Sequence, residues 1–358
     1  EKAPVVIKTL PGERAVLDPL RAGMAIRVLQ SRHIRLEDVS VRNACERGVL
    51  IEESNHVELR NLSVADSDGL DDDNVAGVSL LGSKTVTISG GEFYDNFDRD
   101  AANTGGEATE NSGNIVVFGG ADVRVENTHI FNTLGQDLAG FCLKYKHAST
   151  DPAATFQVYG NRFDNCSFFA VSTGTQNTHV RDNVVVGGAG FVSRDNGGLT
   201  HQVNQHFEYN TVYIEGPAFE LEATADYRSS RFPSDPSNFG FNHNIVVDLR
   251  PAYGSTGGIV ELATYADDVM FKHVSQQLRF HSNCYSNVRT SVSFALAASR
   301  TPGKAGSRYD IFDWKALGYD KGSVLANPAF VDSQAGDLRL KSTSACQGKG
   351  SRVFRTPH

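Results

Sequence analysis

The chain has 358 residues, a net charge of −8 at neutral pH, 34 glycines and a single tryptophan, Trp314. No run of about 18 apolar residues occurs, which argues against a membrane-spanning helix. The acidic balance and the lack of a basic stripe argue against nucleic-acid binding. The five cysteines are dispersed without a CxxC pair, which argues against a zinc site and allows at most two disulfides.

The opening segment 5–14 has the pattern of a strand and a turn rather than a signal peptide, so we expect the chain to begin inside a longer precursor. From there a single phrase recurs: an alternating apolar and polar run, a short turn of Gly, Asn or Asp, and a second alternating run. Its copies lie at 34–41, 57–64, 86–93, 123–130, 156–163, 179–186, 207–214, 241–247 and 278–285. A third strand run precedes the copies, as at 48–52, 77–81 and 114–118.

The turn between the two runs holds asparagine in seven copies and glycine in one. Its members are Asn61, Gly90, Asn127, Asn161, Asn183, Asn210, Asn244 and Asn283. The shortest step defines a repeat of roughly 22 residues, and longer steps contain inserted loops. Three short strands in each repeat predict the coils of a β-solenoid. Asparagine tolerates a left-handed backbone and bonds to copies above and below, which predicts an internal ladder.

The repeated phrase and its asparagines resemble the right-handed parallel β-helix proteins, which include secreted polysaccharide lyases, hydrolases and epimerases. The opening segment 6–18 is similar to the entry coil of polysaccharide-lyase-like members. Segments 323–332 and 336–341 resemble their C-terminal segment. The resemblance implies an all-β, right-handed parallel β-helix of about ten coils with inserted loops. We expect one domain over 1–358, with coils to about residue 300 and a C-terminal segment, 301–358, packed on the last coils.

Three strand runs of the third kind carry an unusual number of charges. They are 140–147, 190–196 and 218–224. Alternation predicts that Phe141, Leu143, Tyr145, Phe191, Ser193, Phe219, Leu221 and Ala223 face inward. The residues between them then face outward: Lys144, Lys146, Val192, Arg194, Asn196, Glu220 and Glu222. So many charges predict a solvated sheet face rather than a buried one.

Alignment of the inward apolar pairs predicts which outward residues share a column. That column contains Glu52, Leu81, Phe118, Lys144, Ser172, Arg194 and Glu222. Lys144 or Lys146 is expected roughly 10 Å from Arg194 at the backbone, with Ser172 between them. Two cationic side chains over small residues suit the carboxylate of an acidic sugar.

The resemblance to lysine-and-arginine lyases of the chondroitinase B and alginate lyase type implies β-elimination on a uronic-acid polymer. Lys146 is the candidate base, because the neighbouring cations Lys144 and Arg194 favour its neutral amine. Arg194 is the candidate partner of the substrate carboxylate. His147 is a candidate proton donor, and Tyr145 is a weaker one because it faces inward.

Further residues are candidates for substrate binding. They are Asp195, Asn196, Glu222, and the loop residues Arg99, Arg228 and Arg231. The polar insertions 95–107 and 226–236 lie just outside the charged strands, and loops on a rigid solenoid commonly form the walls of a groove.

Glu220, Glu222 and Glu261 form a group of carboxylates with three interpretations. They are candidate Ca²⁺ ligands, as in some lyases of this resemblance. They also suit the acid and base pair of a glycoside hydrolase. The third interpretation is simple pairing with Lys144 and Arg194, in which all these charges belong to a solvated face.

We therefore expect a secreted, periplasmic or cell-surface enzyme that cleaves an anionic, uronic-acid-containing polysaccharide by β-elimination, with Ca²⁺ as the candidate cofactor. A glycoside hydrolase or C5-epimerase on the same scaffold is the first alternative. A non-catalytic, adhesin-like solenoid that binds glycans is the second, because this architecture supports several activities.

Overall fold

The computed structural model describes residues 3–13, 15–69, 75–97, 112–131, 141–146, 153–166, 170–194, 202–224, 237–249, 259–265, 275–286, 294–297 and 307–354. The chain divides into two compact units, Glu1–Val171 and Ser172–His358. Each unit is described by itself, and the single domain expected from the sequence stays a prediction.

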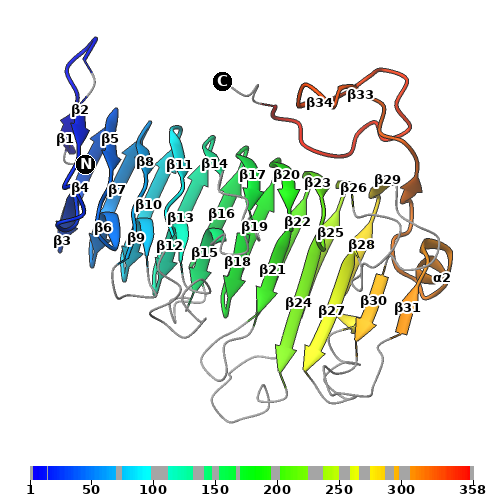
Figure 1. The fold of residues 1–358 in the computed structure, drawn as a ribbon. Coiled ribbons are helices and arrows are strands. Elements are labelled where there is room, and N and C mark those ends of the chain that lie inside the picture. Colours follow the sequence, from blue (N-terminus) through cyan, green and yellow to red (C-terminus); the bar gives the residue numbers. More distant parts are fainter. Residues whose placement is uncertain are drawn as a thin grey trace. The chain divides into compact units, whose positions relative to one another are not determined.

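The first unit contains three parallel sheets, drawn from blue to green in Figure 1. The first sheet contains β1 (Val5–Lys8), β4 (Arg32–Glu37), β7 (Asn55–Arg60), β10 (Lys84–Ser89), β13 (Ala121–Glu126) and β16 (Phe156–Tyr159). The second contains β2 (Ala15–Leu17), β5 (Val39–Arg42), β8 (Ser63–Ala65), β11 (Glu92–Tyr94), β14 (His129–Phe131) and β17 (Arg162–Cys166). The third contains β3 (Ile26–Leu29), β6 (Arg47–Glu52), β9 (Ala76–Leu81), β12 (Gly113–Phe118) and β15 (Phe141–Lys146). Strand β18 (Ala170–Thr173) spans the boundary of the units.

The second unit repeats the same three sheets. The first contains β19 (Gln176–Arg181), β22 (Val203–Glu208), β25 (Ser237–Asn242) and β28 (Leu278–His281). The second contains β20 (Val184–Gly188), β23 (Thr211–Ile214), β26 (Ile245–Asp248), β29 (Cys284–Ser286) and β32 (Val324–Leu325). The third contains β21 (Phe191–Arg194), β24 (Phe219–Thr224), β27 (Val260–Tyr265), β30 (Phe294–Ala297) and β31 (Ser307–Tyr309), of which β31 is antiparallel to β30.

Inward side chains of successive coils stack in register and form the core. In the third sheet of the first unit, Val49, Val78, Ile115 and Leu143 are register partners and all are fully buried. Burial of each such side chain contributes about 1.5–3 kcal/mol, so each coil is stabilised by its neighbours rather than by its own strands. The three-strand repeat expected from the sequence is confirmed.

The predicted asparagine ladder is present in the second unit. Asn183, Asn210, Asn244 and Asn283 are fully buried. The Oδ1 of Asn210 accepts hydrogen bonds from the Nδ2 and backbone N–H of Asn183, at 2.9 and 3.0 Å. The same pattern joins Asn210 to Asn244 and Asn244 to Asn283. The ladder therefore satisfies buried backbone N–H groups at each turn.

The expectation that one residue both forms the ladder and adopts the left-handed backbone is wrong in the second unit. There the positive φ belongs to the preceding residue: Asp182, Tyr209, His243 and Ser282. In the first unit, Asn61, Gly90 and Asn127 adopt positive φ themselves, whereas at Asn161 the positive φ belongs to the preceding residue, Gly160. Aligned asparagines in the sequence thus occupy two consecutive turn positions, because the corner between the first and second sheets spans two residues.

The C-terminal segment of the second unit packs on its second sheet. Helix α2 (Ile311–Ala316) begins after the N-cap Asp310, and β33 (Phe330–Asp332) pairs with β34 (Asp337–Leu340) antiparallel. Phe330 and Leu338 join a buried cluster with Val184 and Ile245. A disulfide between Cys284 and Cys346 links the segment to β29. Together with Cys142–Cys166 in the first unit, this makes two disulfides, and Cys45 belongs to neither.

A pair of stacked histidines on the first sheet of the second unit predicts acid sensitivity. His179 and His206 are register partners with ring centroids 5.3 Å apart. Burial lowers the pKa of both, and the charge of His206 lowers the pKa of His179 further, whereas Glu208 acts in the opposite direction. The folded pKa values lie below the unfolded value of about 6.5, so the unfolded chain binds more protons as pH falls.

Stability is therefore expected to be full above about pH 6.5 and to decline as pH falls through the folded pKa values. Thermal unfolding measured between about pH 7.5 and pH 5 checks this, and His206→Gln should flatten the decline because it removes one titrating ring. An unchanged pH profile in the variant would assign the acid sensitivity to other groups.

Candidate functional site

The outward face of the third sheet in the first unit ends in two lysines on β15. Lys144 is only 7 % exposed, and its Nζ lies 5.1 Å from the centre of the Phe141 ring. Lys146, the last residue of the strand, is half-buried. Its register partner on β12 is Phe118, whose side chain is 45 % exposed. An accessible cation thus lies beside an exposed aromatic ring.

The predicted outward column is wrong at β15. Phe118 pairs with Lys146, whereas Lys144 pairs with Val116, so Lys146 occupies the column of Glu52 and Leu81. Three inward residues of β15, Phe141, Leu143 and Tyr145, allow two alignments that differ by two residues. Since both alignments bury apolar side chains, alternation could not choose between them.

Tyr145 faces inward, as its position in the alternation predicted. Its side chain is 1 % exposed and its hydroxyl donates to the Gly120 carbonyl at 2.9 Å. Burial raises the pKa of the Tyr145 phenol well above its ordinary value. A buried phenol that is already hydrogen-bonded to the backbone does not reach a polysaccharide, so Tyr145 is excluded as the proton donor.

In the second unit the outward face of the third sheet brings an arginine beside glutamates. Arg194, the last residue of β21, is the register partner of Glu222 on β24. Glu220 is the register partner of Val192 on one side and of Glu261 on the other. Neighbouring strands lie about 4.8 Å apart, so the backbones of Glu220 and Glu261 are close together. The predicted proximity of these two glutamates is confirmed at the level of strand register.

The prediction that this outward face is solvated is wrong at several positions. Val192 is fully buried and Glu220 is 5 % exposed; in the first unit, Lys144 is likewise buried, at 7 %. Glu261 and Arg194 are half-buried. A charged residue is nearly always paired or hydrogen-bonded when it is buried, so these side chains belong to a structured, partly dry surface.

Ser172 is not part of the outward face, which corrects a second position of the predicted column. Its side chain is 1 % exposed and its Oγ donates to the Gln205 Oε1 at 3.1 Å. A hydrogen bond between the hydroxyls of Ser172 and Thr175 completes this inner network. Two residues further on, the Gly174 N–H donates to the Arg194 carbonyl. Ser172 therefore contributes to the core of the second unit.

Several predicted site residues lie outside the described residues. They are Arg99, His147, Asp195, Asn196, Arg228 and Arg231. The backbone of Glu222 is described, but its side chain is not. Lys146 belongs to the first unit and Arg194 to the second, so the expected separation of these two residues stays a prediction.

The predicted calcium site is likewise untested. Among the described residues, no three or more His, Cys, Asp or Glu side chains are arranged to hold a metal ion. Because the Glu222 side chain lies outside that description, ligation by Glu220, Glu222 and Glu261 stays a prediction. Carboxylates on two neighbouring strands are the oxygen ligands that Ca²⁺ accepts.

Two features of the first unit were not predicted as site residues from the sequence. One is the exposed ring of Phe118, which its outward parity on β12 could have indicated. The other is Asp164, which accepts from Arg162 Nε at 2.8 Å and lies 2.7 Å from His129 Nε2. Burial raises the pKa of Asp164, but hydrogen bonds from His129 and Arg162 outweigh burial and hold the pKa below its ordinary value. Only strand register brings these three residues together.

Comparison with known proteins identifies the class of the fold. A chain wound as three parallel strands per coil is a β-solenoid. Residues 24–213 match the family model described as "Right handed beta helix region", which covers more than half of the chain. The chain therefore belongs to the right-handed β-helix family. No curated protein sequence matches it at a significant level.

Solved structures with a similar fold have low sequence identity to this chain. PfbA, a surface adhesin of Streptococcus pneumoniae, is 12 % identical over 80 % of this chain and 73 % of its own, with a TM-score of 0.48. The PL6-family alginate lyase AlyGC is 11 % identical over 99 % of this chain, with a TM-score of 0.37. An arginine-to-alanine variant of AlyGC is 10 % identical over the same share, with a TM-score of 0.44. The chain spans about half the length of AlyGC, 53 % in both cases.

In the described part of the chain, no helix is long and apolar enough to cross a membrane.

Proposed function

We propose that the protein is a secreted polysaccharide lyase that cleaves a uronic-acid-containing polymer by β-elimination. The observation that carries the proposal is Lys146, a half-buried lysine at the end of β15 beside the exposed ring of Phe118. A cation next to an accessible aromatic ring suits an acidic sugar, since the ring offers an apolar surface and the cation attracts the carboxylate.

In this proposal Arg194 binds the carboxylate of the uronate. Its guanidinium presents parallel N–H donors that match a carboxylate. Neutralisation of that charge makes the C5 proton more acidic, because the electron pair left at C5 is delocalised into the carboxyl group.

Lys146 acts as the base. Its neutral amine takes the C5 proton, the electron pair forms the C4–C5 double bond, and the C4–O bond breaks. The departing oxygen takes a proton, for which His147 is the candidate donor. The products are an unsaturated uronate at one new chain end and an intact sugar at the other.

The strand pairing of Glu220 and Glu261 is the observation behind a glycoside hydrolase as the second candidate. They are register partners on neighbouring strands. In retaining glycosidases the two carboxyl groups are about 5–5.5 Å apart, close to the spacing of adjacent strands. The Glu220 side chain is 5 % exposed, which favours a structural or metal-binding role over direct attack on a sugar.

An assay with alginate, pectate and glycosaminoglycans separates the candidates. A lyase produces ultraviolet absorbance from the new double bond, in step with new reducing ends. A hydrolase produces reducing ends without that absorbance, and a C5-epimerase changes the uronate composition without cleavage. Binding without any product would support an adhesin-like role and would overturn the proposed lyase activity.

A further inference from the structure

A pocket lies at the corner between the first and second sheets of the first unit, on strands other than those of the candidate active site. Its volume is about 530 Å³. It is lined by residues of four successive coils, among them Thr9, Asp38, Asn61, Ser63 and Glu92. Volumes of roughly 300–1,000 Å³ are typical of sites for small organic ligands.

The pocket forms because one connection is longer than the equivalent connections of the next coils. Between β4 and β5 the chain turns at Asp38 alone, whereas the chain from β1 to β2 continues through Thr9 to Glu13. The Thr9 hydroxyl donates to the Asp38 carbonyl and fixes the start of this longer connection. The connection therefore forms one wall over the outward face of β5 and β8.

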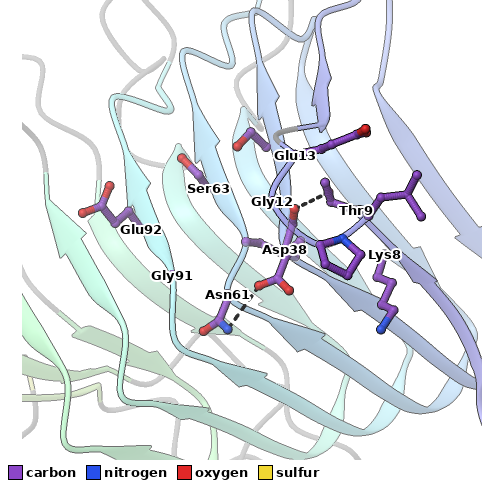
Figure 2. Close-up of a pocket in the computed structure, with 13 residues that line it drawn as sticks. Lys8, Thr9, Gly12, Glu13, Asp38, Asn61, Ser63, Gly91 and Glu92 are labelled. Carbon is purple, nitrogen blue, oxygen red and sulfur yellow. Dashed lines mark hydrogen bonds between the residues drawn. The ribbon is translucent and has the colours of Figure 1, made fainter.

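The lining combines hydrogen-bond acceptors with groups that both donate and accept. Asn61 Nδ2 donates to Asp38 Oδ1 at 3.3 Å, and Figure 2 shows the two side chains next to each other. Ser63 and Glu92 are register partners on β8 and β11 and line another part of the pocket (Figure 2). A carboxylate next to an amide and a hydroxyl can hold neighbouring sugar hydroxyls, one as donor and one as acceptor.

The charge of the lining selects against acidic ligands. Among the described residues, the lining contains the carboxylates of Glu13, Asp38 and Glu92 and one ammonium group, that of Lys8. An acidic polysaccharide would be repelled by this excess of negative charge. The acids do not converge on one point, since no three metal-binding side chains in the described part of the chain are placed to hold an ion. Their spread suits a ligand larger than a metal ion.

An aromatic platform lies beside the pocket. Tyr94 follows Glu92 by two residues on β11 and so faces the same side of the sheet. Its ring stacks on that of Phe131, its register partner on β14, at 4.6 Å and an interplanar angle of 6°. Sugar rings present apolar C–H faces, so this platform extends the site from one sugar to several.

We propose that this pocket and the Tyr94–Phe131 platform bind an oligosaccharide of non-acidic sugars. This goes beyond the proposed lyase activity, because the pocket would bind a non-acidic glycan rather than an acidic polymer and would break no bond in it. The site would hold the protein on a neutral or amino-sugar glycan while another face meets the acidic polymer. Avidity from two such contacts exceeds either affinity alone.

Calorimetric titration of the full chain with cellotetraose, a chitosan tetramer and an alginate tetramer tests the proposal. We expect a Kd on the order of 1 mM or tighter for at least one of the first two. Ser63→Trp should abolish binding because the indole fills the pocket, with Thr87→Trp, outside the pocket, as its control. Glu92→Gln should weaken binding at least about 5-fold, whereas Glu126→Gln should not.

Binding of cellotetraose identifies a neutral glycan, and binding of the chitosan tetramer alone identifies an amino-sugar glycan. Binding of the alginate tetramer only, or no binding of any tetramer at about 10 mM, overturns the proposal. Binding that persists in a folded Ser63→Trp variant overturns it as well. The measured affinities for the tetramers do not depend on catalysis, so Lys146→Ala should leave them unchanged. Failure of the proposed lyase activity and failure of the proposed glycan binding can therefore be told apart.

Discussion

Lys146→Ala is expected to lower the rate of the proposed uronate elimination by about 10²–10⁴-fold, because in the proposed mechanism Lys146 is the base that takes the C5 proton. The loss should appear in kcat more than in KM, because the proposed mechanism assigns binding of the carboxylate to Arg194 rather than to Lys146. Formation of the unsaturated product over time measures the effect. The melting temperature should change little, because Lys146 lies half-buried at the end of its strand.

Lys84→Ala is the matched control, since Lys84 is an exposed lysine at the start of β10 in the first sheet. It should retain the wild-type rate. An active Lys146→Ala variant would remove Lys146 from the mechanism, whereas equal losses in both lysine variants would indicate a general effect of charge on substrate attraction.

Asp320→Asn is expected to lower the free energy of unfolding by about 3–5 kcal/mol. The Asp320 side chain is fully buried and accepts hydrogen bonds from four groups. They are Tyr285 Oη at 2.9 Å, Trp314 Nε1 at 2.8 Å, Asn283 Nδ2 at 2.7 Å and Ser323 Oγ at 2.7 Å. An amide keeps one acceptor oxygen, so donors that faced the other carboxylate oxygen lose their partner.

The position of Asp320 explains the size of this effect. Burial raises the pKa of Asp320, and the four donors oppose burial because they stabilise the carboxylate. Through Asn283, Asp320 terminates the asparagine ladder, and through Trp314 it holds helix α2. One carboxylate thus connects the last turns of the coils to the C-terminal segment of the second unit.

Urea denaturation followed by circular dichroism and by the fluorescence of Trp314, the single tryptophan, measures the change. Asp332→Asn, at an exposed aspartate of β33, should stay within about 1 kcal/mol of the wild type. If Asp320→Asn unfolded at the same urea concentration as the wild type, the hydrogen bonds to Asp320 would not contribute to the stability of the fold.

Much of the architecture could be predicted because strand alternation and turn chemistry are local. The phrase at 57–64 became β7 and β8 with Asn61 at the turn, and 48–52 lies within β6. The inward positions of Leu143 and Tyr145 were also predicted correctly, since both are buried register partners of the core residues Ile115 and Val117. The asparagine ladder from Asn183 to Asn283 could be predicted because asparagine recurs at the turn of successive repeats.

The candidate site was predicted less well, because contact between coils depends on strand register. Alternation repeats every two residues, so it assigned Lys144 and Lys146 to the outward face but could not choose which of them pairs with Phe118. For the same reason, the contact between Asp164 and His129 was not predicted. It forms only because β14 and β17 are paired.

The sequence by itself determined the winding of the chain and the face on which most strand residues lie, since both follow from periodic patterns within one repeat; Ser172 is an exception. The tertiary structure alone decided the register at β15, the burial of Lys144 and Glu220, and the pocket at Asp38 and Asn61. The physical reason is that these features arise where coils and connections distant in sequence meet, and the energy that decides them comes from packing between residues that no local pattern relates.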